Sequence, residues 1–97
     1  MPTTVLLRTP GGSDLYDRVN EEMGVENDLP DGLIHHYAAA AGDEMIIFDV
    51  WESREAFERF QNERLRPAIA KVLGDQMPSP EDAPRPTVAE LHNEFPK

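Results

Sequence analysis

The 97-residue sequence contains no cysteine. This absence excludes disulfide bonds, thiolate nucleophiles and cysteine-bound zinc, and it fits a reducing compartment. Basic residues are also scarce, because nine Lys and Arg stand against 19 Asp and Glu and give a formal net charge of −10. A chain this acidic repels phosphate backbones and anionic lipid headgroups. We therefore expect neither nucleic acid nor a membrane surface among its partners.

Long apolar runs are missing as well. No window approaches the roughly 20 apolar residues that cross a bilayer, and the first residues lack the basic and apolar regions of a signal peptide. These absences predict a cytoplasmic protein. The length predicts a single domain over residues 1–97, with one small core. Phosphate-binding glycine loops, dinucleotide fingerprints and nucleophile elbows are also absent from the sequence.

The first part of the chain predicts one strand and one helix. Residues 3–8 form a short, β-rich apolar run that ends before a Pro-Gly-Gly breaker. Residues 13–23 carry apolar side chains at helical spacing, and Ser13 or Asp14 is expected to cap this helix. Gly24 is expected to end it in a left-handed conformation.

The middle of the chain predicts a β-hairpin that leads into a second helix. Residues 33–40 and 45–52 are rich in β-branched and aromatic side chains and flank a Gly-Asp turn. The amphipathic run over 53–73 indicates a helix. Pro67 lies inside this run and removes an amide, which predicts a kink or a restart near it.

The last part of the chain predicts an extended connection and a final strand. Residues 74–86 contain four prolines and no periodicity, whereas residues 87–95 alternate in polarity. The resulting order β-α-β-β-α-β, with right-handed crossovers, is that of the ferredoxin-like plait. The predicted fold class is therefore α+β, with a four-stranded antiparallel sheet and two helices on one face.

One face of such a sheet would stay uncovered. The predicted third strand is nevertheless apolar on both faces, with Ile46, Phe48 and Val50 on one and Met45, Ile47 and Trp51 on the other. A half-exposed sheet normally alternates apolar with polar side chains. A second copy packed sheet to sheet would cover this face and add the buried area that a small core lacks. The sequence thus predicts a homodimer.

Residues 49–60 read Asp-Val-Trp-Glu-Ser-Arg-Glu-Ala-Phe-Glu-Arg-Phe. This segment resembles the strand-to-helix junction of the dimeric α+β barrel proteins, particularly the antibiotic-biosynthesis monooxygenase-like group. An acidic residue two before a tryptophan, a helix cap and an aromatic pattern recur there. Residues 32–38, Gly-Leu-Ile-His-His-Tyr-Ala, are similar to the second strand of small members. The resemblance implies a dimeric α+β barrel with a pocket between sheet and helices in each subunit.

The resemblance also limits the chemistry. Characterised relatives oxidise activated phenols without metal or flavin, degrade haem, isomerise lactones, dehalogenate or only bind ligands. Haem-degrading members carry a histidine on the second helix, and residues 53–74 contain none, so haem degradation is not expected. The resemblance implies a monooxygenase-like enzyme that uses no cofactor and acts on an aromatic or phenolic substrate. The alternative is a non-catalytic ligand-binding or structural homodimer.

The hairpin register brings candidate site residues together. A two-residue turn would place His36 opposite Asp49 and Ile34 opposite Trp51, and side chains directly opposed across a ladder share a face. A carboxylate this close would orient the imidazole, so His36 and Asp49 form the candidate catalytic pair. Trp51, Ile34 and Phe60 are the candidate contacts of an aromatic substrate.

Each of these residues also has a structural interpretation. His36 and Asp49 would satisfy one another as a buried polar pair at the dimer interface. Trp51 would be a large core residue whose indole N–H finds a carbonyl, and Phe60 would pack in the core. On the other face of the same strand, His35 and Tyr37 are expected to be a satisfied histidine and a packed tyrosine.

No metal is predicted for this chain. His36 and His92 would lie at opposite edges of the plait, too far apart for one site within a subunit. An intersubunit site between them stays open, although no ligand spacing supports it. The acidic runs lack the spacing of calcium loops and indicate solvated surface.

Overall fold

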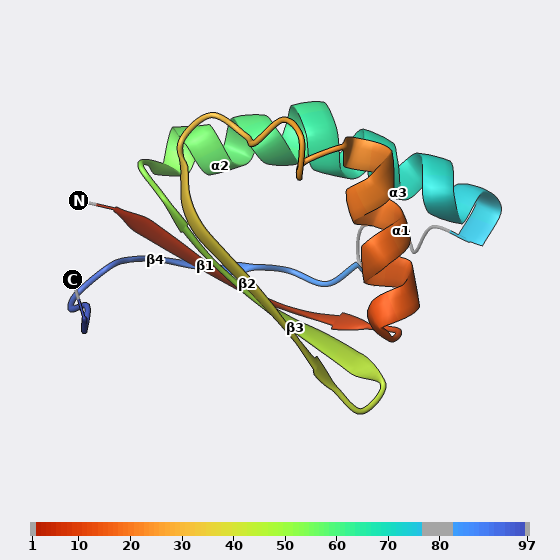
Figure 1. Ribbon diagram of the computed structural model, residues 1–97, viewed down its shortest axis with the longest axis horizontal. Coiled ribbons are helices and arrows are strands. Elements are labelled where there is room, and N and C mark those ends of the chain that lie inside the picture. The colour runs from red at the N-terminus through yellow and green to blue at the C-terminus, as the bar shows by residue number, and fades with distance from the viewer. Residues whose placement is uncertain (1, 77–82, 97) are drawn as a thin grey trace.

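The structure is a computed structural model that describes residues 2–76 and 83–96. Four strands form one antiparallel sheet in the order β2-β3-β1-β4, and the helices lie together on one side of it (Figure 1). The expected α+β ferredoxin-like plait is therefore confirmed. The elements are β1 (Thr3–Pro10), α1 (Ser13–Met23), β2 (Leu33–Ala41), β3 (Glu44–Trp51), α2 (Arg54–Phe60), the π-helical turn η1 (Gln61–Leu65), α3 (Arg66–Leu73), the 3₁₀ turn η2 (Gly74–Gln76) and β4 (Thr87–Glu90).

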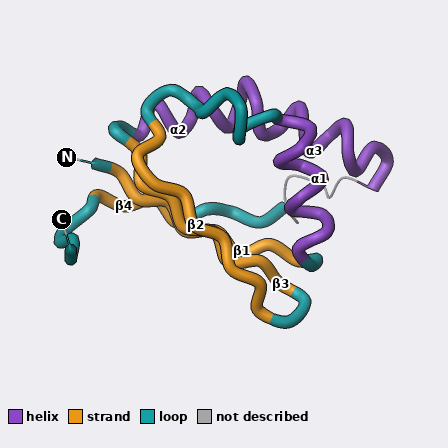
Figure 2. The backbone as a smooth tube through the Cα atoms, in the orientation of Figure 1, coloured by secondary structure: helices purple, strands orange, loops and turns teal. Residues whose placement is uncertain are grey.

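The β2–β3 hairpin is built around a two-residue turn, as predicted. Ala41 pairs with Glu44 across the turn, and Gly42 adopts a φ of +60°. Glycine reaches this left-handed conformation without the steric penalty that a Cβ brings. The tip of the hairpin projects away from the helical layer (Figure 2).

Helix α1 begins differently from the prediction. Its N-cap is Gly12, which is extended and makes no side-chain cap hydrogen bond, so neither Ser13 nor Asp14 caps the helix. Ser13 is the first residue of the helix. A side chain caps the free amides from the preceding N-cap position, which Gly12 occupies here. The helix ends as predicted at Gly24, whose φ is 68° and whose N–H donates to the Asn20 carbonyl at 2.9 Å.

The second predicted helix is one helical run that changes pitch before its proline. Ser53 caps it, and its Oγ accepts from the Ala56 N–H at 3.1 Å. In η1 the Arg66 N–H donates to the carbonyl of Gln61, five residues back, which is the wider spacing of a π turn. Pro67 then lies at the start of α3, directly after the π turn, so the change of pitch falls where the proline lacks a backbone N–H. Within the described part of the chain, no helix has the length and apolar character to span a membrane.

Strand β4 is shorter than predicted. The alternation over 87–95 predicted a strand of that length, whereas β4 ends at Glu90. Glu90 faces Thr3, the first residue of β1, and one further bond joins the Leu91 N–H to the Pro2 carbonyl at 2.9 Å. Among the described residues the ladder between β1 and β4 thus ends with these contacts, although the alternating pattern runs on to residue 95.

Only part of the predicted connection over 74–86 is described. Its first three residues form the turn η2, and residues 83–86 form neither helix nor strand. Residues 77–82 of the predicted connection, with Pro78 and Pro80, lie outside the described residues.

The core lies between the sheet and α2. Trp51 is at its centre, at 1% exposure, with ring centroids 5.9 Å from Phe57 and 5.1 Å from Phe60. Aromatic pairs at such separations contribute about 0.5–1.5 kcal/mol beyond the area they bury. The buried cluster consists of Val5, Trp51, Ala56 and Phe57, with Leu33, Phe60 and Val88 packed against it.

The sheet face away from the helices carries an outer apolar row, formed by Tyr37, Phe48 and Leu6. Phe48 faces Tyr37 on one side and Leu6 on the other, and all three side chains are exposed. Figure 1 shows α1, α2 and α3 on the opposite side of the sheet. The predicted uncovered apolar face is therefore present in the single chain.

Candidate active site

His36 and Asp49 meet as a cross-strand pair, in the register that the turn predicted. The two residues face each other, and His36 Nδ1 lies 2.5 Å from Asp49 Oδ1. Asp49 is buried at 7% exposure, whereas the His36 side chain is 35% exposed. A carboxylate only accepts hydrogen bonds, so Nδ1 is the nitrogen that donates. In the neutral ring this leaves Nε2 as the acceptor.

This pair lies on the helix-bearing face of the sheet. His36 is bonded to Tyr16 of α1, and Asp49 is bonded to Trp51, which packs against Phe57 of α2. The structural interpretation placed the pair at the dimer interface, which stays a prediction; the pair itself lies on the face opposite the exposed apolar row. The pair therefore lies on the helical side of the sheet, with Asp49 buried and His36 partly exposed.

Ile34 does not face Trp51 as predicted. Leu33 takes that position, because the hairpin register shifts directly after it, and one extra residue in a strand makes a β-bulge. Leu33 packs against the core, and Ile34 is exposed. The adjacent Gly32, at φ +88°, passes so close to α2 that a Cβ there would lie 2.6 Å from Ala56 Cβ. The expected contact of Ile34 with a substrate beside Trp51 therefore loses its geometric basis.

Asp49 also holds the tryptophan. Trp51 Nε1–H donates to Asp49 Oδ2 at 3.2 Å, so each carboxylate oxygen has its own donor. Among residues 2–76 and 83–96, no buried side-chain nitrogen or oxygen lacks a partner. The burial of Trp51 agrees with a core residue whose N–H is satisfied, although the acceptor is a carboxylate and not a carbonyl. Asp49 thereby links the imidazole of His36 to the indole.

Tyr16 is a site residue that the sequence reasoning missed. Its hydroxyl is hydrogen-bonded to His36 Nε2, and the two rings are nearly parallel, with centroids 6.0 Å apart and an interplanar angle of 4°. Burial raises the pKa of Tyr16 above its ordinary value of 10.0, and the negative charge of Asp49 raises it further, against a hydrogen bond with Asn20 that lowers it. Tyr16 directly follows Leu15, one of the apolar residues at helical spacing within residues 13–23. Its position in the sequence is therefore only a weak indication that its side chain faces the sheet.

His35 and Tyr37 lie on the opposite face, as expected, but Tyr37 is not packed. Its exposure is 60%, and it stacks on His35 with centroids 6.0 Å apart. The predicted packed tyrosine is therefore wrong for the single chain, because β2 is an edge strand with nothing of the described chain beyond it.

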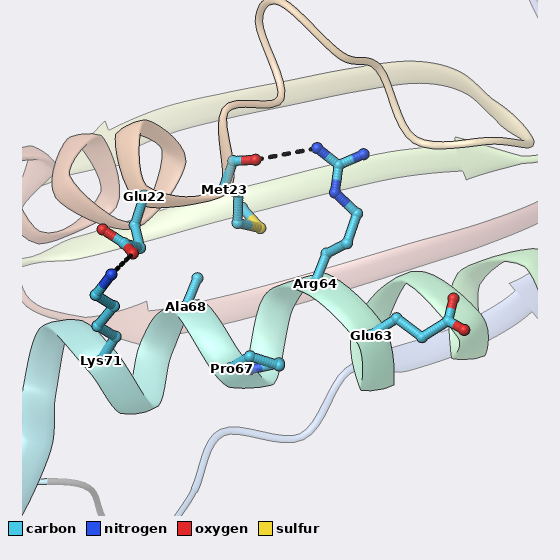
Figure 3. A pocket seen from close by; sticks show the side chains of 7 residues that line it. All are labelled: Glu22, Met23, Glu63, Arg64, Pro67, Ala68 and Lys71. Atoms are coloured by element: carbon cyan, nitrogen blue, oxygen red, sulfur yellow. Dashed lines mark hydrogen bonds and ion pairs between the residues drawn. The ribbon is translucent and has the colours of Figure 1, made fainter.

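A surface pocket of about 260 Å³ lies between α1 and the η1–α3 segment (Figure 3). Lys71 Nζ lies 2.7 Å from Glu22 Oε1 at one end of the pocket. At the other end Arg64 Nη2 donates to the Met23 carbonyl at 3.0 Å. Lys71 and Arg64, the two basic residues of this pocket, thus already have partners within the chain.

A smaller pocket, about 170 Å³, is lined by Phe60 of α2 and by the loop residues 28–31 among others. His36, Asp49 and Trp51 line neither pocket. Both volumes are below the roughly 300 Å³ at which small-molecule pockets usually begin. Of the predicted substrate contacts, only Phe60 borders one of these pockets.

The metal expectations concern His36 and His92. Strands β2 and β4 are the two edges of the sheet, and His92 follows the end of β4, so the two histidines lie at opposite edges as expected. Within the described ranges, no group of three or more His, Cys, Asp or Glu side chains is arranged to hold a metal ion.

The sequence matches no family model and no curated protein, whereas the fold matches several solved structures. Rv0793 from Mycobacterium tuberculosis has a TM-score of 0.69 and 20% identity over 98% of this chain and 99% of that chain. SnoaB, a cofactor-independent oxygenase from Streptomyces nogalater, has a TM-score of 0.62 and 14% identity over 99% and 97%. The ActVA-Orf6 monooxygenase of Streptomyces coelicolor, in complex with nanaomycin D, has a TM-score of 0.62 and 15% identity over 96% and 89%. The chain therefore has the fold of the antibiotic-biosynthesis monooxygenase-like proteins, and the resemblance expected from residues 49–60 is confirmed at the level of the fold.

Proposed function

We propose that this protein is a monooxygenase-like enzyme that needs no cofactor and acts on a small aromatic or phenolic substrate. The observation that carries the proposal is the buried Asp49 carboxylate 2.5 Å from His36 Nδ1. It holds the imidazole in the orientation and tautomer of a general base, with Nε2 as the accepting atom. The fold shared with a cofactor-independent oxygenase supports this reaction class.

In this mechanism His36 removes the proton of a phenolic hydroxyl. Nε2 takes the proton, and the Asp49 carboxylate stabilises the imidazolium that forms. The resulting phenolate is electron-rich and reacts with dioxygen. One oxygen atom enters the ring and the other leaves as water, and the substrate itself supplies the electrons. The chain's own groups therefore only hold and move protons and exclude water.

Trp51 acts in this proposal mainly through Asp49. Its indole N–H fixes the second carboxylate oxygen at 3.2 Å, so the carboxylate cannot rotate away from His36 without breaking that bond. Phe60 packs on Trp51 and borders the smaller pocket, which makes it the predicted substrate contact best placed to meet an aromatic ligand.

The working form in this proposal is a homodimer. The outer apolar row of Tyr37, Phe48 and Leu6 is exposed in one chain, and exposed contiguous apolar surface marks interaction sites. A second copy packed on the same face would bury the row against itself, as a two-fold interface does. The active-site pair lies on the other face and would keep its access.

Oxidation of 1,5-dihydroxynaphthalene tests the proposed reaction. The diphenol and dioxygen give a hydroxynaphthoquinone and water, so oxygen uptake and quinone absorbance must rise together. Metal-free wild-type protein should accelerate both above the buffer rate. His36→Ala should lower the accelerated rate by roughly 10²- to 10⁴-fold, the usual worth of a general base. His92→Ala, which changes an exposed histidine beyond β4, should leave it unchanged. A wild-type rate equal to that of buffer would refute the proposal.

A non-catalytic ligand-binding or structural dimer is the second candidate. It is favoured by the burial of Trp51 and by two pockets smaller than usual ligand sites. His36→Ala leaves Asp49 buried without its partner and should lower stability in either case, so the two functions are separated by the wild-type activity and its loss in a variant that still folds.

A further inference from the structure

The acceptor nitrogen of His36 is occupied by a group of the chain itself. Tyr16 is hydrogen-bonded to Nε2, with its ring nearly parallel to the imidazole, while Asp49 holds Nδ1. Both ring nitrogens are therefore in use. In the proposed reaction the substrate must present its hydroxyl to the nitrogen that Tyr16 now contacts.

Tyr16 offers the same chemical group as the proposed substrate. Burial raises the pKa of Tyr16, which favours the protonated phenol, and this phenol can donate to Nε2 of an imidazole whose proton is on Nδ1. A phenol at this place satisfies Nε2 in the absence of a ligand, and an unsatisfied acceptor in a partly buried site would be unfavourable.

We propose that Tyr16 occupies the hydroxyl subsite of the candidate active site and determines its specificity, because a ligand hydroxyl reaches His36 Nε2 only by displacing the Tyr16 phenol. The inference rests on the proposed function for the identity of the ligand group. The occupation of Nε2 is a property of the chain and can be tested without any ligand.

Displacement does not require the helix to unfold. Tyr16 is partly buried and is the fourth residue of α1. Rotation between staggered rotamers can carry its ring away from the imidazole. The first turn of α1 is also free of a side-chain cap, since Gly12 is the N-cap.

Occupation by a phenol selects among ligands. Displacement exchanges one phenolic hydrogen bond for another, so a hydroxyl that donates no better than tyrosine gains little from the exchange. A ligand that only accepts hydrogen bonds cannot replace the donor at all. The site therefore favours phenols that donate more strongly than tyrosine and rejects ethers, ketones and quinones.

The rate of carbethoxylation by diethyl pyrocarbonate measures how accessible the His36 imidazole is, because the reagent attacks unprotonated imidazole nitrogens. Tandem mass spectrometry follows each of the three histidines, so His35 and His92 are internal controls. Tyr16→Phe keeps the aromatic ring and removes the hydroxyl, and Tyr37→Phe is the matched control on the other face. His36 should react roughly 2- to 12-fold faster in Tyr16→Phe, the factor that one neutral hydrogen bond represents. Equal His36 rates in wild type and Tyr16→Phe would overturn the proposal.

A general loss of fold in Tyr16→Phe would accelerate all three histidines together. In that case the test is an NMR experiment on the wild-type protein. It measures magnetisation transfer between the ring protons of Tyr16 and those of His36. This signal should be present in the free protein and should weaken when 2-naphthol is added. Its absence from the free protein would equally overturn the proposal.

Binding of 2-naphthol separates this inference from the proposed function. Tyr16→Phe should bind 2-naphthol roughly 2- to 12-fold more tightly than wild type, and should bind naphthalene, which lacks the hydroxyl, with unchanged affinity. Equal gains for both compounds would mean that the variant only opens space, which contradicts a hydroxyl subsite. If 2-naphthol binds no variant while His36 still gains reactivity, the proposed function fails and the occupation of Nε2 by Tyr16 stands.

Discussion

Gly32→Ala is predicted to destabilise the protein far more than Gly42→Ala. Both glycines have a positive φ, +88° and +60°, where an alanine costs about 1–2 kcal/mol. Only Gly32 is crowded. A Cβ added there would lie 2.6 Å from Ala56 Cβ and 3.9 Å from Trp51 Cε3, whereas nothing lies within 4 Å of one added at Gly42. The two variants therefore share a backbone penalty and differ in a steric one.

The steric penalty follows from the distance. Carbon atoms in contact lie about 3.5–4.0 Å apart, so the start of β2 and helix α2 must separate by about 1 Å to admit the new methyl group. Overpacking of this kind in a core costs about 1–3 kcal/mol. We expect a loss of about 2–5 kcal/mol for Gly32→Ala and of about 1–2 kcal/mol for Gly42→Ala.

Urea unfolding followed by the fluorescence of Trp51, the single tryptophan, measures both losses. Ala56→Gly should partly rescue Gly32→Ala, because it removes the methyl group that the new Cβ meets, and it should not rescue Gly42→Ala. Equal losses for the two glycine variants, or no rescue, would refute the close approach of β2 to α2 and with it the placement of the bulge at Ile34.

Three further predictions concern the caps, the phenol and the outer face. Ser53→Ala should cost about 1 kcal/mol in urea unfolding because it removes the α2 cap, whereas Ser13→Ala, inside α1, should cost clearly less; equal losses would contradict the cap assignments. The raised pKa of Tyr16 keeps its phenol neutral in the folded state after the unfolded chain has ionised. Stability should therefore fall as pH rises above about 10, and Tyr16→Phe should make this decline shallower; an unchanged decline contradicts the burial. Leu6→Asp on the outer apolar row should give a folded monomer in sedimentation, while Leu29→Asp in an exposed loop should leave the dimer intact; a wild-type monomer at micromolar concentration would refute the dimer.

The hairpin register could be predicted because the Gly-Asp turn sets it. That turn placed His36 opposite Asp49 before any tertiary contact was considered, and the pairing is observed. The predicted register failed at Ile34, where a bulge shifts the pairing, next to the close approach of Gly32 to Ala56 of another element. A local pattern carries no sign of such a contact.

Tyr16 and the end of β4 show the same limit. The bond from Tyr16 to His36 depends on where α1 crosses the sheet, which the spacing of apolar residues does not fix. The alternation over 87–95 was real, but β4 stops at Glu90 because β1 begins at Thr3. A strand extends only as far as its partner, and its partner is known only once the sheet is assembled.

The tautomer of His36 tests the central claim most directly, since the proton carrier and the role of Tyr16 both require Nε2 to be the unprotonated, accepting nitrogen. Long-range ¹H–¹⁵N NMR correlations in the neutral ring should show the proton on Nδ1 in the wild-type protein, and this preference should disappear in Asp49→Asn. A proton found on Nε2, or the same mixture of tautomers as in the exposed His92, would contradict the account.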